Sequence, residues 1–370
     1  DTEFLAAVGT NNFIADSIRG INDQLGEFQR AARLVITRTP ASTSLDATTA
    51  RAENMASIVG DSLTGTGLNA LLRAGEVTGR VPRLIATPGF TGFHSPGQAN
   101  PVVAAMPSIL DRLLAHAVVD GPATSRQAAL DWRETIQSDR IIPVDPAVRV
   151  SVADGSIVTR PLSARVLGIG VRRDHEKGGK PFHSWANQPV RGIVGPSRPI
   201  GFSLTDGATE GQELLAANVG VLLRGEGGVD DAIASGGFVF VGTDNAGEDE
   251  LWRFYNVMRG RDYIHLLYLK ALRFYLGRFN ISGQTLQSIA NTMNFALRDL
   301  KADNDIIGYE PVTFPVEQNP AEALRAGNIT VRFRAEEAPV LRRIDILSAR
   351  YRPALEDMIG QLATQLAQAA

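Results

Sequence analysis

Two hydrophobic periodicities alternate in the middle of the chain. Residues 83–87, 117–119 and 140–144 are short apolar runs, which predict strands. Between them, residues 101–116 and 125–137 carry apolar side chains three or four positions apart, which predicts amphipathic helices. Strands and helices that alternate across tight turns are typical of parallel βαβ units with right-handed crossovers. The pattern therefore predicts such units at the centre of the fold.

The flanking regions add further elements. The same reasoning predicts helices at 1–32, 163–173, 211–223, 251–277, 283–301 and 354–370. Strands are predicted at 33–38, 236–241 and 328–333, and a hairpin at 147–160 with its turn at Asp154-Gly155. Residues 338–353 are predicted to be extended. The expected fold class is mixed α/β, with a βαβ-containing core, a mixed sheet flanked by helices, and an extended C-terminal arm.

Composition narrows the class of protein. The chain has 370 residues, of which 44% are hydrophobic and 21% charged, as expected for an ordered globular protein. With 37 Lys and Arg against 40 Asp and Glu, the net charge of −3 excludes a uniformly basic coat for nucleic acid. There is no cysteine, which excludes disulfides, thiolate metal sites and cysteine nucleophiles. No apolar run is long enough to predict a membrane span.

Two carboxylates are the best catalytic candidates. Asp120 and Asp145 each end a predicted parallel strand, and ligands of open α/β sheets bind at that edge. An α/β small-molecule enzyme that uses this pair is one hypothesis. The alternative is that Asp120-Gly-Pro and Asp145-Pro are turn sequences. We favour turns, because no histidine, lysine or serine motif nearby completes a site.

Histidines give little support for a metal site. The nearest grouping is His175, Glu176 and His183, which we expect in a Gly-rich loop and which lacks the spacing of a helical metal pair. The other three histidines, His94, His116 and His265, form no two-histidine helical metal pair either. No complete phosphate-loop or nucleophile-elbow motif is present either. We expect no metal and no cofactor.

Residues 251–278 combine six Lys or Arg with seven aromatic residues and a single acid, Asp262. Basic residues among aromatics can bind nucleic acid. The other interpretation is a core helix, with Leu251, Met258 and Phe274 on its buried face and the cations on a basic outer face. We favour the core helix, and we expect its basic face to meet an acidic protein surface.

Several short segments occur in an order that resembles the tail sheath proteins of contractile bacteriophages and R-type bacteriocins. They are PRLIATPGF (82–90), DGP (120–122), VDP (144–146), RGIVGPSRP (191–199), ELLAANVGVLLR (213–224), the W-x-F-x-x-V-x-R pattern from Trp252, NIS (280–282) and LRDLKADNDIIG (297–308). The chain departs from the family at FVFVGT (238–243), where many relatives carry a W-G-N-R-T type run. Relatives also carry an N-terminal arm ahead of the segment that resembles 1–25, and we expect that arm to be missing here.

The resemblance implies a structural role without catalytic residues. Sheath subunits form hexameric rings that stack helically around a tail tube, and the sheath shortens to drive the tube through a cell envelope. The implied partners are further copies of the chain, the tail tube protein, and baseplate and tail-end proteins, with no nucleic acid and no membrane insertion. The implied location is the virion tail or a contractile particle, assembled in the bacterial cytoplasm.

The C-terminal arm is the segment for which the resemblance implies linkage between subunits, because family arms add strands to sheets of neighbours. We expect four regions: 1–80, 81–235, 236–337 and the arm with its helix at 338–370. Within the arm, Arg342, Ile344, Ile346 and Tyr351 are the predicted inter-subunit residues. Alternating β-favouring side chains suit pairing through backbone hydrogen bonds, and charges discourage uncontrolled pairing while the subunit is free.

Overall fold

The computed structural model describes Gly9 and residues 12–93, 95, 97–152 and 154–369. The chain divides into two compact units, residues 1–340 and 341–370. Most of the predicted helical stretch 1–32 is present as α2 (Phe13–Leu25), which begins at the side-chain cap of Asn12. The part of that stretch before residue 12, Gly9 excepted, lies outside the described residues, as does His94. In the described part of the chain, no helix combines the length and apolar character needed to cross a membrane.

Unit 1 contains all the described strands and every helix but one. After α2, its α-helices are α3 (Ala47–Val59), α4 (Ala74–Thr78), α5 (Pro101–Leu113), α6 (Arg126–Glu134), α7 (Ser163–Glu176), α8 (Glu210–Ala216), α9 (Tyr255–Leu272), α10 (Gly283–Ala302) and α11 (Ala321–Arg325). Its 3₁₀ helices are η1 (Gly26–Ala31), η2 (Gly67–Arg73), η3 (Glu250–Trp252) and η4 (Val316–Gln318). Its strands are β1 (Leu84–Ile85), β2 (His116–Asp120), β3 (Ile141–Asp145), β4 (Val148–Ser151), β5 (Ile157–Arg160), β6 (Gln188–Pro189), β7 (Gly195–Pro196), β8 (Gly220–Arg224), β9 (Phe238–Val241), β10 (Ile306–Thr313) and β11 (Arg332–Glu337).

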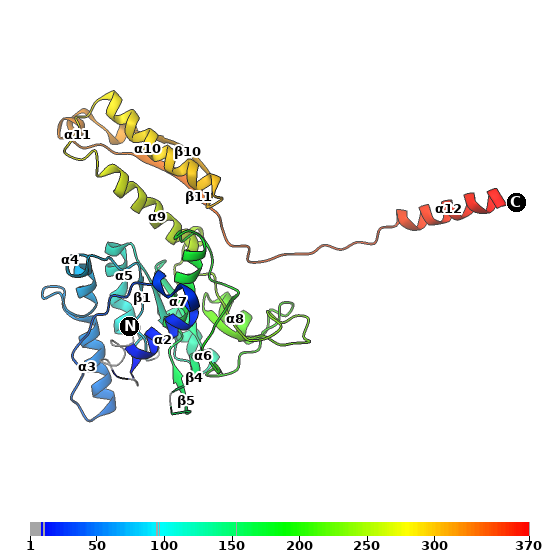
Figure 1. Cartoon of the computed structure of the whole chain (residues 1–370), viewed down its shortest axis with the longest axis horizontal. Helices are drawn as coiled ribbons and strands as arrows, with labels where there is room; N and C mark the ends of the chain where they lie inside the picture. Colours follow the sequence, from blue (N-terminus) through cyan, green and yellow to red (C-terminus); the bar gives the residue numbers. More distant parts are fainter. Residues whose placement is uncertain (1–8, 10–11, 94, 96, 153, 370) are drawn as a thin grey trace. The chain divides into compact units, whose positions relative to one another are not determined.

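A six-stranded mixed sheet forms the centre of unit 1 (Figure 1), in the order β1-β2-β3-β8-β9-β6. The first four strands are parallel neighbours, whereas β9 runs antiparallel to β8 and β6 antiparallel to β9. Helix α5 connects β1 to β2, and α6 connects β2 to β3. The predicted βαβ units and the mixed sheet are therefore confirmed.

Side chains of the sheet alternate between two cores. On β2, Ala117 and Val119 pack with α5 and η2, whereas Val118 packs with α7 on the opposite face. On β3, Ile141 joins the first core and Ile142 the second. This alternation follows from the two-residue period of a strand. Because helices cover both faces, the strands at the centre are apolar throughout, as parallel strands usually are.

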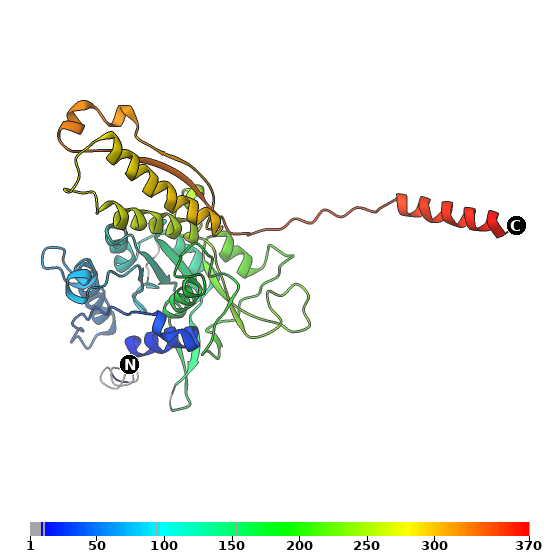
Figure 2. The ribbon, with the colours of Figure 1, turned by 45° about the horizontal axis from the view of Figure 1, so that its top comes forward.

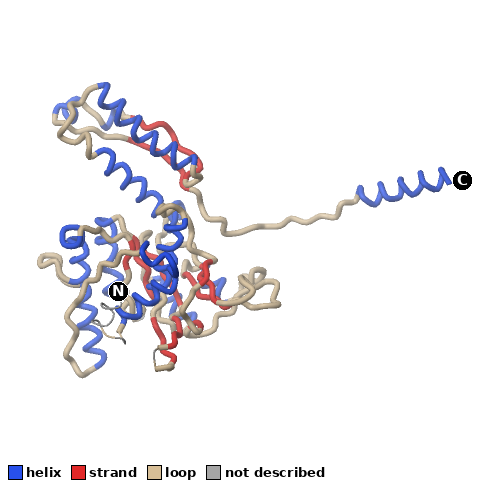
Figure 3. The backbone as a smooth tube through the Cα atoms, viewed as in Figure 1, coloured by secondary structure: helices blue, strands red, loops and turns tan. Residues whose placement is uncertain are grey.

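A second lobe of unit 1 is built from α9, α10, β10 and β11. The two strands form an antiparallel sheet of their own, and α10 lies alongside them (Figures 2 and 3). Ile264 and Tyr268 of α9 share a core with Met293 and Leu297 of α10. The first half of α9 belongs to the sheet-bearing lobe, because Tyr255 packs in the core beneath the central sheet. Helix α9 therefore joins the two lobes.

Unit 2 consists of an extended segment, residues 341–352, and the helix α12 (Pro353–Ala369). The extended segment follows the sequence prediction for 338–353, and the helix follows the prediction for 354–370. Polar and apolar side chains alike are exposed along both parts. Unit 2 thus contributes no residue to the hydrophobic cores described above.

Three local predictions are wrong. The stretch 211–223 is helical only as far as Ala216, and Gly220–Arg224 is β8, a central strand between β3 and β9. A strand that is buried on both faces loses the alternation that distinguishes it from a helix. The run 33–38 is extended but belongs to no sheet. The strand expected at 328–333 begins only at Arg332, because the side chain of Asn319 bonds the backbone of Thr330 and holds it in a loop.

Candidate functional site

The two candidate catalytic carboxylates lie on neighbouring strands but are committed to structural bonds. Asp120 ends β2, and its carboxylate accepts hydrogen bonds from the backbone N–H of Ser163 at 2.7 Å and from the Ser163 hydroxyl at 2.6 Å. Asp145 ends β3 and accepts a bond from the N–H of Ala123 at 2.7 Å and from Arg198 at 2.7 Å. Both side chains are buried. Each of the four oxygens is therefore occupied by a protein group.

These bonds explain why the two aspartates occur at the strand ends. Asp120 fixes the first residue of α7, and burial raises its pKa to about 6. Asp145 holds the loop after β2 through its bond to Ala123, whose φ is 57°. Burial raises the pKa of Asp145, although the positive charge of Arg198 acts in the opposite direction. Neither solvated turns nor a catalytic pair describes this arrangement. The aspartates are buried anchors that join the strand ends to α7 and to Arg198.

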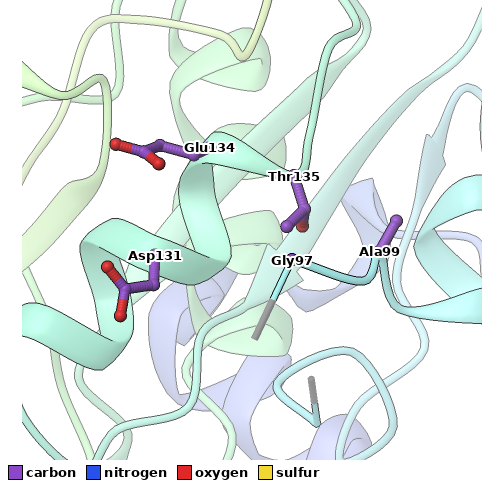
Figure 4. Close-up of a pocket in the computed structure, with 5 residues that line it drawn as sticks. All are labelled: Gly97, Ala99, Asp131, Glu134 and Thr135. Atoms are coloured by element: carbon purple, nitrogen blue, oxygen red, sulfur yellow. The ribbon is translucent and has the colours of Figure 1, made fainter. Parts of the chain in front are cut away.

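Two cavities offer no catalytic constellation either. One, of about 470 Å³, is lined by Gly97, Ala99 and three residues of the α6 region, Asp131, Glu134 and Thr135 (Figure 4). The other, of about 420 Å³, lies between α2, residues 34–39, β1 and α7, and Arg38 is the one charged side chain among the described residues that line it. Among the described residues, neither lining includes Asp120, Asp145 or a histidine.

The side chains of the grouping His175, Glu176 and His183 have separate neighbours in the structure. Among the described residues there is no group of three or more His, Cys, Asp or Glu side chains that could hold a metal ion. His175 instead packs against the ring of Phe28, with ring centroids 5.0 Å apart. Glu176 pairs with Arg173 at 2.8 Å, and partial burial lowers the pKa of His183. The grouping His175, Glu176 and His183 is therefore not a metal centre in the described structure.

The basic outer face predicted for 251–278 is only partly present. Arg259 is buried, pairs with Asp174 and lies 4.7 Å from the Trp185 ring. Arg261 bonds both carboxylate oxygens of Glu337, at 2.6 and 2.8 Å. These acids lie more than 70 positions away in sequence, so the pairing could not be read from the local pattern. Cations expected to face a partner are instead neutralised inside unit 1.

The apolar face predicted for this helix also needs correction. Met258 is buried as expected, but Leu251 is 81% exposed and Phe274 is 51% exposed. The residue that sequence reasoning missed is Asp262, which is buried and accepts bonds from His116 Nε2 at 2.9 Å and from Arg140. Since Asp262 lies on α9, His116 begins β2 and Arg140 precedes β3, the network attaches α9 to the central sheet.

Helices α9 and α10 with their connecting loop carry charge of one sign over a long stretch. Residues 263–298 contain four Lys or Arg and no Asp or Glu. All four cations, Lys270, Arg273, Arg278 and Arg298, are exposed. A search of the sequence for long acid-free stretches would have found this surface. The aromatic and basic content of 251–278 does not distinguish its exposed cations from those that are paired inside unit 1.

The predicted arm residues are accessible. Ile344 is 70% exposed, Ile346 85% and Tyr351 72%. Arg342 is also exposed, and the neighbouring Arg343 pairs with Asp345 at 2.8 Å. The segment therefore presents apolar, β-favouring side chains between charges, as the sequence predicts. Its role in linking subunits stays a prediction.

Comparison with known proteins shows to which family the chain belongs. No family model matches the chain. A putative prophage major tail sheath protein of Pseudomonas aeruginosa is 30% identical over 296 residues, which cover 79% of this chain and 72% of the relative. The chain belongs to the tail sheath protein family. The tail sheath protein of Escherichia phage P2 is 24% identical over 348 residues, covering 92% of this chain and 81% of that sheath protein.

Solved structures share the sheath fold. A chain in the anti-feeding prophage baseplate superposes with a TM-score of 0.57 and 18% identity, covering 84% of this chain and 82% of that chain. A chain of the PVC sheath complex, an extracellular contractile injection system in its contracted state, gives a TM-score of 0.61 and 14% identity, covering 78% and 76%. The resemblance noted from short sequence segments is thus confirmed.

Proposed function

We propose that this chain is the repeating subunit of a contractile tail sheath. The observation that carries the proposal is the match of 30% identity over 296 residues to a tail sheath protein. The relatives' names describe sheath proteins, which supports a structural rather than an enzymatic role. The full occupation of the Asp120 and Asp145 oxygens by protein groups points the same way.

The assembly we propose is a stack of hexameric rings wound around a tail tube, which shortens on triggering and drives the tube through a cell envelope. Its partners are further copies of the chain, the tube protein, and baseplate and tail-end proteins. The location is the virion tail or a related contractile particle, after assembly in the bacterial cytoplasm. The function requires no nucleic acid, no membrane insertion and no cofactor.

The extended segment of unit 2 is the proposed link between copies. Large rearrangement of rigid subunits requires a connection that bends without losing its register. A strand joined through backbone hydrogen bonds meets this requirement, and a segment of ten residues spans about 33 Å. Arg342, Ile344 and Ile346 share one face of such a strand because they alternate, whereas Tyr351 falls on the other face of a regular strand.

The sheet of β10 and β11 is the proposed acceptor on the neighbouring copy. Within the described chain each of these strands pairs with the other alone, so each retains an open outer edge. An open edge presents unpaired backbone N–H and C=O groups to an incoming strand. Helix α10 already covers this sheet with apolar side chains, which gives the added strand an apolar surface to extend.

The proposed contact with the tube is polar and reversible, because the sheath must hold the tube and then slide along it. The sequence left two candidate surfaces, the 251–278 helix and the C-terminal helix. Helix α12 carries an apolar stripe and no Lys or Arg, which suits a stable contact better than a sliding one. We therefore assign the tube contact to the exposed cations on the flanks of α9 and α10, Lys270 and Arg298.

The arm proposal is tested with two matched double variants of the full chain. Ile344→Asp with Ile346→Asp places two charges on the face expected to pack on the neighbour. Leu341→Asp with Leu347→Asp places two charges on the opposite face and serves as the control. Negative-stain electron microscopy is expected to show tubes for the control and none for the first variant. Normal tubes from the Ile344 and Ile346 variant would overturn the assigned face.

A further inference from the structure

The cavity of about 420 Å³ lies at the edge of the central sheet, and we call it the edge slot. Leu84 and Ile85 of β1 line it, and among the described residues β1 pairs with β2 alone. Leu71 of η2 lines the slot and belongs to the core on one face of the sheet, whereas Leu167 of α7 lines it and belongs to the core on the other face. The edge slot therefore lies between the two layers, where one more strand would continue the sheet.

Residues 34–39 (LVITRT) also line the edge slot. All six line it, and they are extended and lie outside any helix or sheet. None of their backbone N–H and C=O groups bonds another described residue. Val35, Ile36 and Thr37 are β-branched, and residues of this kind favour strands. A strand-like run with free backbone groups therefore lies at the place where the sheet has room for a further strand.

Polar and apolar groups around the edge slot both lack partners. The outer edge of a strand such as β1 presents backbone N–H and C=O groups that can take another strand. The Thr87 hydroxyl is buried at the slot and has no hydrogen-bond partner among the described residues. Leu34 is 49% exposed and Ile36 is 42% exposed, although both border the apolar slot. Pairing of 34–38 with β1 would satisfy backbone groups on both segments and bury these two side chains.

We infer that residues 34–38, which we call the strap, close onto β1 and add a strand to the central sheet. The position described above is the open state of the strap. Paired strands lie about 4.8 Å apart, so the strap closes by moving into the edge slot. No other molecule is needed, because the strap already lines the slot. Residues 32–46 contain no helix or strand, and connections of this length are uncommon in compact domains unless they have a role. Their length provides the slack for closure.

Closure fills a void and removes an open sheet edge. Protein interiors contain few voids larger than a water molecule, so filling the edge slot with Leu34 and Ile36 favours the closed state. The loss of conformational freedom in the strap opposes it. An open edge pairs readily with other chains. If copies join by strand addition, the closed strap prevents an incoming arm from pairing at β1 instead of at β10 or β11. This consequence rests on the proposed sheath function, whereas closure itself does not.

A disulfide scan tests closure, because the chain has no cysteine of its own. Five full-length variants combine Ala86→Cys, which borders the edge slot, with a cysteine at one position of the strap. A disulfide requires Cα atoms within about 7 Å, a spacing that paired strands provide. Side chains alternate along a strand, so we expect disulfides at alternate positions of the strap only. Ala86→Cys with Leu45→Cys is the matched control, because Leu45 is fully exposed in the same connection. Disulfides at every position of the strap, or at none, would overturn the inference.

Hydrogen exchange of the unmodified full-length chain completes the test. We expect amides of the strap to exchange at least about tenfold more slowly than in an unstructured peptide, at low and high protein concentration alike. Ala86→Phe fills the edge slot and should remove this protection, whereas Leu45→Phe should not.

Three results would overturn the inference. The first is exchange of the strap at the rate of an unstructured peptide, and the second is protection that persists in Ala86→Phe. The third is protection that appears only at high concentration, which would assign the edge slot to a strand of another copy. None of these measurements depends on tube formation, so the proposed sheath function and the closure of the strap can fail separately.

Discussion

Asp262 and Asp345 show how differently the two units of the chain use charge. In unit 1, Asp262 is buried and its carboxylate is shared by His116 and Arg140, which come from segments more than 120 positions away. In unit 2, Asp345 is exposed and pairs with Arg343, two positions away. The first aspartate joins elements of one subunit, whereas the second leaves its surroundings available to another molecule.

The apolar side chains follow the same division. Trp132, Trp185 and Phe240 are completely buried in unit 1. In unit 2, Leu347 is 99% exposed, and the stripe of α12 is exposed along its length. A protein that folded for its own stability alone would not leave such a stripe uncovered. The comparison supports the proposal that unit 1 is a self-sufficient body and that unit 2 connects such bodies.

The largest difference is expected when each aspartate is removed. Asp262→Ala leaves the buried Arg140 without its main partner, so we expect the free energy of unfolding to fall by about 3 to 5 kcal/mol. Asp345→Ala removes an exposed pair and should cost less than about 0.5 kcal/mol. Denaturant unfolding of the two full-length variants measures both. Equal losses would remove the distinction between the units.

Acidic pH should affect unit 1 through two buried groups that act in opposite directions. Burial lowers the pKa of His116 to about 4, so its contribution to stability is complete above its ordinary pKa of 6.5 and is lost as pH falls through about 4. Burial raises the pKa of Asp120 to about 6, so its contribution is complete below its ordinary pKa of 3.8 and is lost as pH rises through about 6. Each change is worth about 3 kcal/mol.

Single variants separate these opposing effects. In the unmodified chain the two contributions nearly cancel between about pH 4 and 6, whereas Asp120→Asn should make stability rise over this range, because it removes the falling contribution. His116→Gln should make stability fall over the same range, because it removes the rising contribution while keeping a donor for Asp262. Tm measured across this range gives both difference curves. If neither variant changes the pH dependence of Tm, burial does not shift the pKa values of these two groups.

The smallest expected effect concerns the tube contact. Lys270→Glu with Arg298→Glu should weaken the association of preassembled tubes with the sheath subunit by about 1 kcal/mol per charge at most, and the loss should shrink at high salt. Arg224→Glu changes an exposed cation outside 263–298 and should leave the association unchanged. Co-sedimentation at low and high salt measures the effect. Binding that is insensitive to salt in every variant would contradict a polar, sliding contact.

The sequence predicts the parts of this fold that depend on local pattern. Strands β2 and β3, the connecting helices, the β4–β5 hairpin and the terminal helix occur where apolar periodicity and turn residues place them. Strand β8 was missed because it lies between β3 and β9 and is buried on both faces, so its residues show no alternation. The order of strands in the sheet depends on contacts between distant segments and leaves no local signal.

The candidate site shows the same limit. The exposed arm was identified because a local pattern, β-favouring side chains between charges, already predicts an extended segment. The cations of 251–278 could not be assigned from sequence, since Arg259 and Arg261 are neutralised by Asp174 and Glu337 in distant elements. Asp120 and Asp145 were placed correctly at the strand ends, but the bonds to Ser163 and Arg198 that define their role come from the tertiary fold.

The boundary between the two units determines where the chain should be shortened to test their separate roles. The N–H of Ala338 bonds the carbonyl of Asp305, and its carbonyl accepts a bond from Asn256. A cut before Ala338 would remove these bonds of unit 1. We therefore place the cut after Val340, which coincides with the division between the two compact units.

Electron microscopy of the full-length chain beside the chain that ends at Val340, with thermal melting of both, is the most direct test that unit 1 is the body and unit 2 the connection. We expect tubes from the full-length chain. From the shortened chain we expect a soluble monomer that melts cooperatively and forms no tubes. Normal tubes from the shortened chain would contradict the linking role of unit 2, and a shortened chain that fails to fold would contradict the self-sufficiency of unit 1.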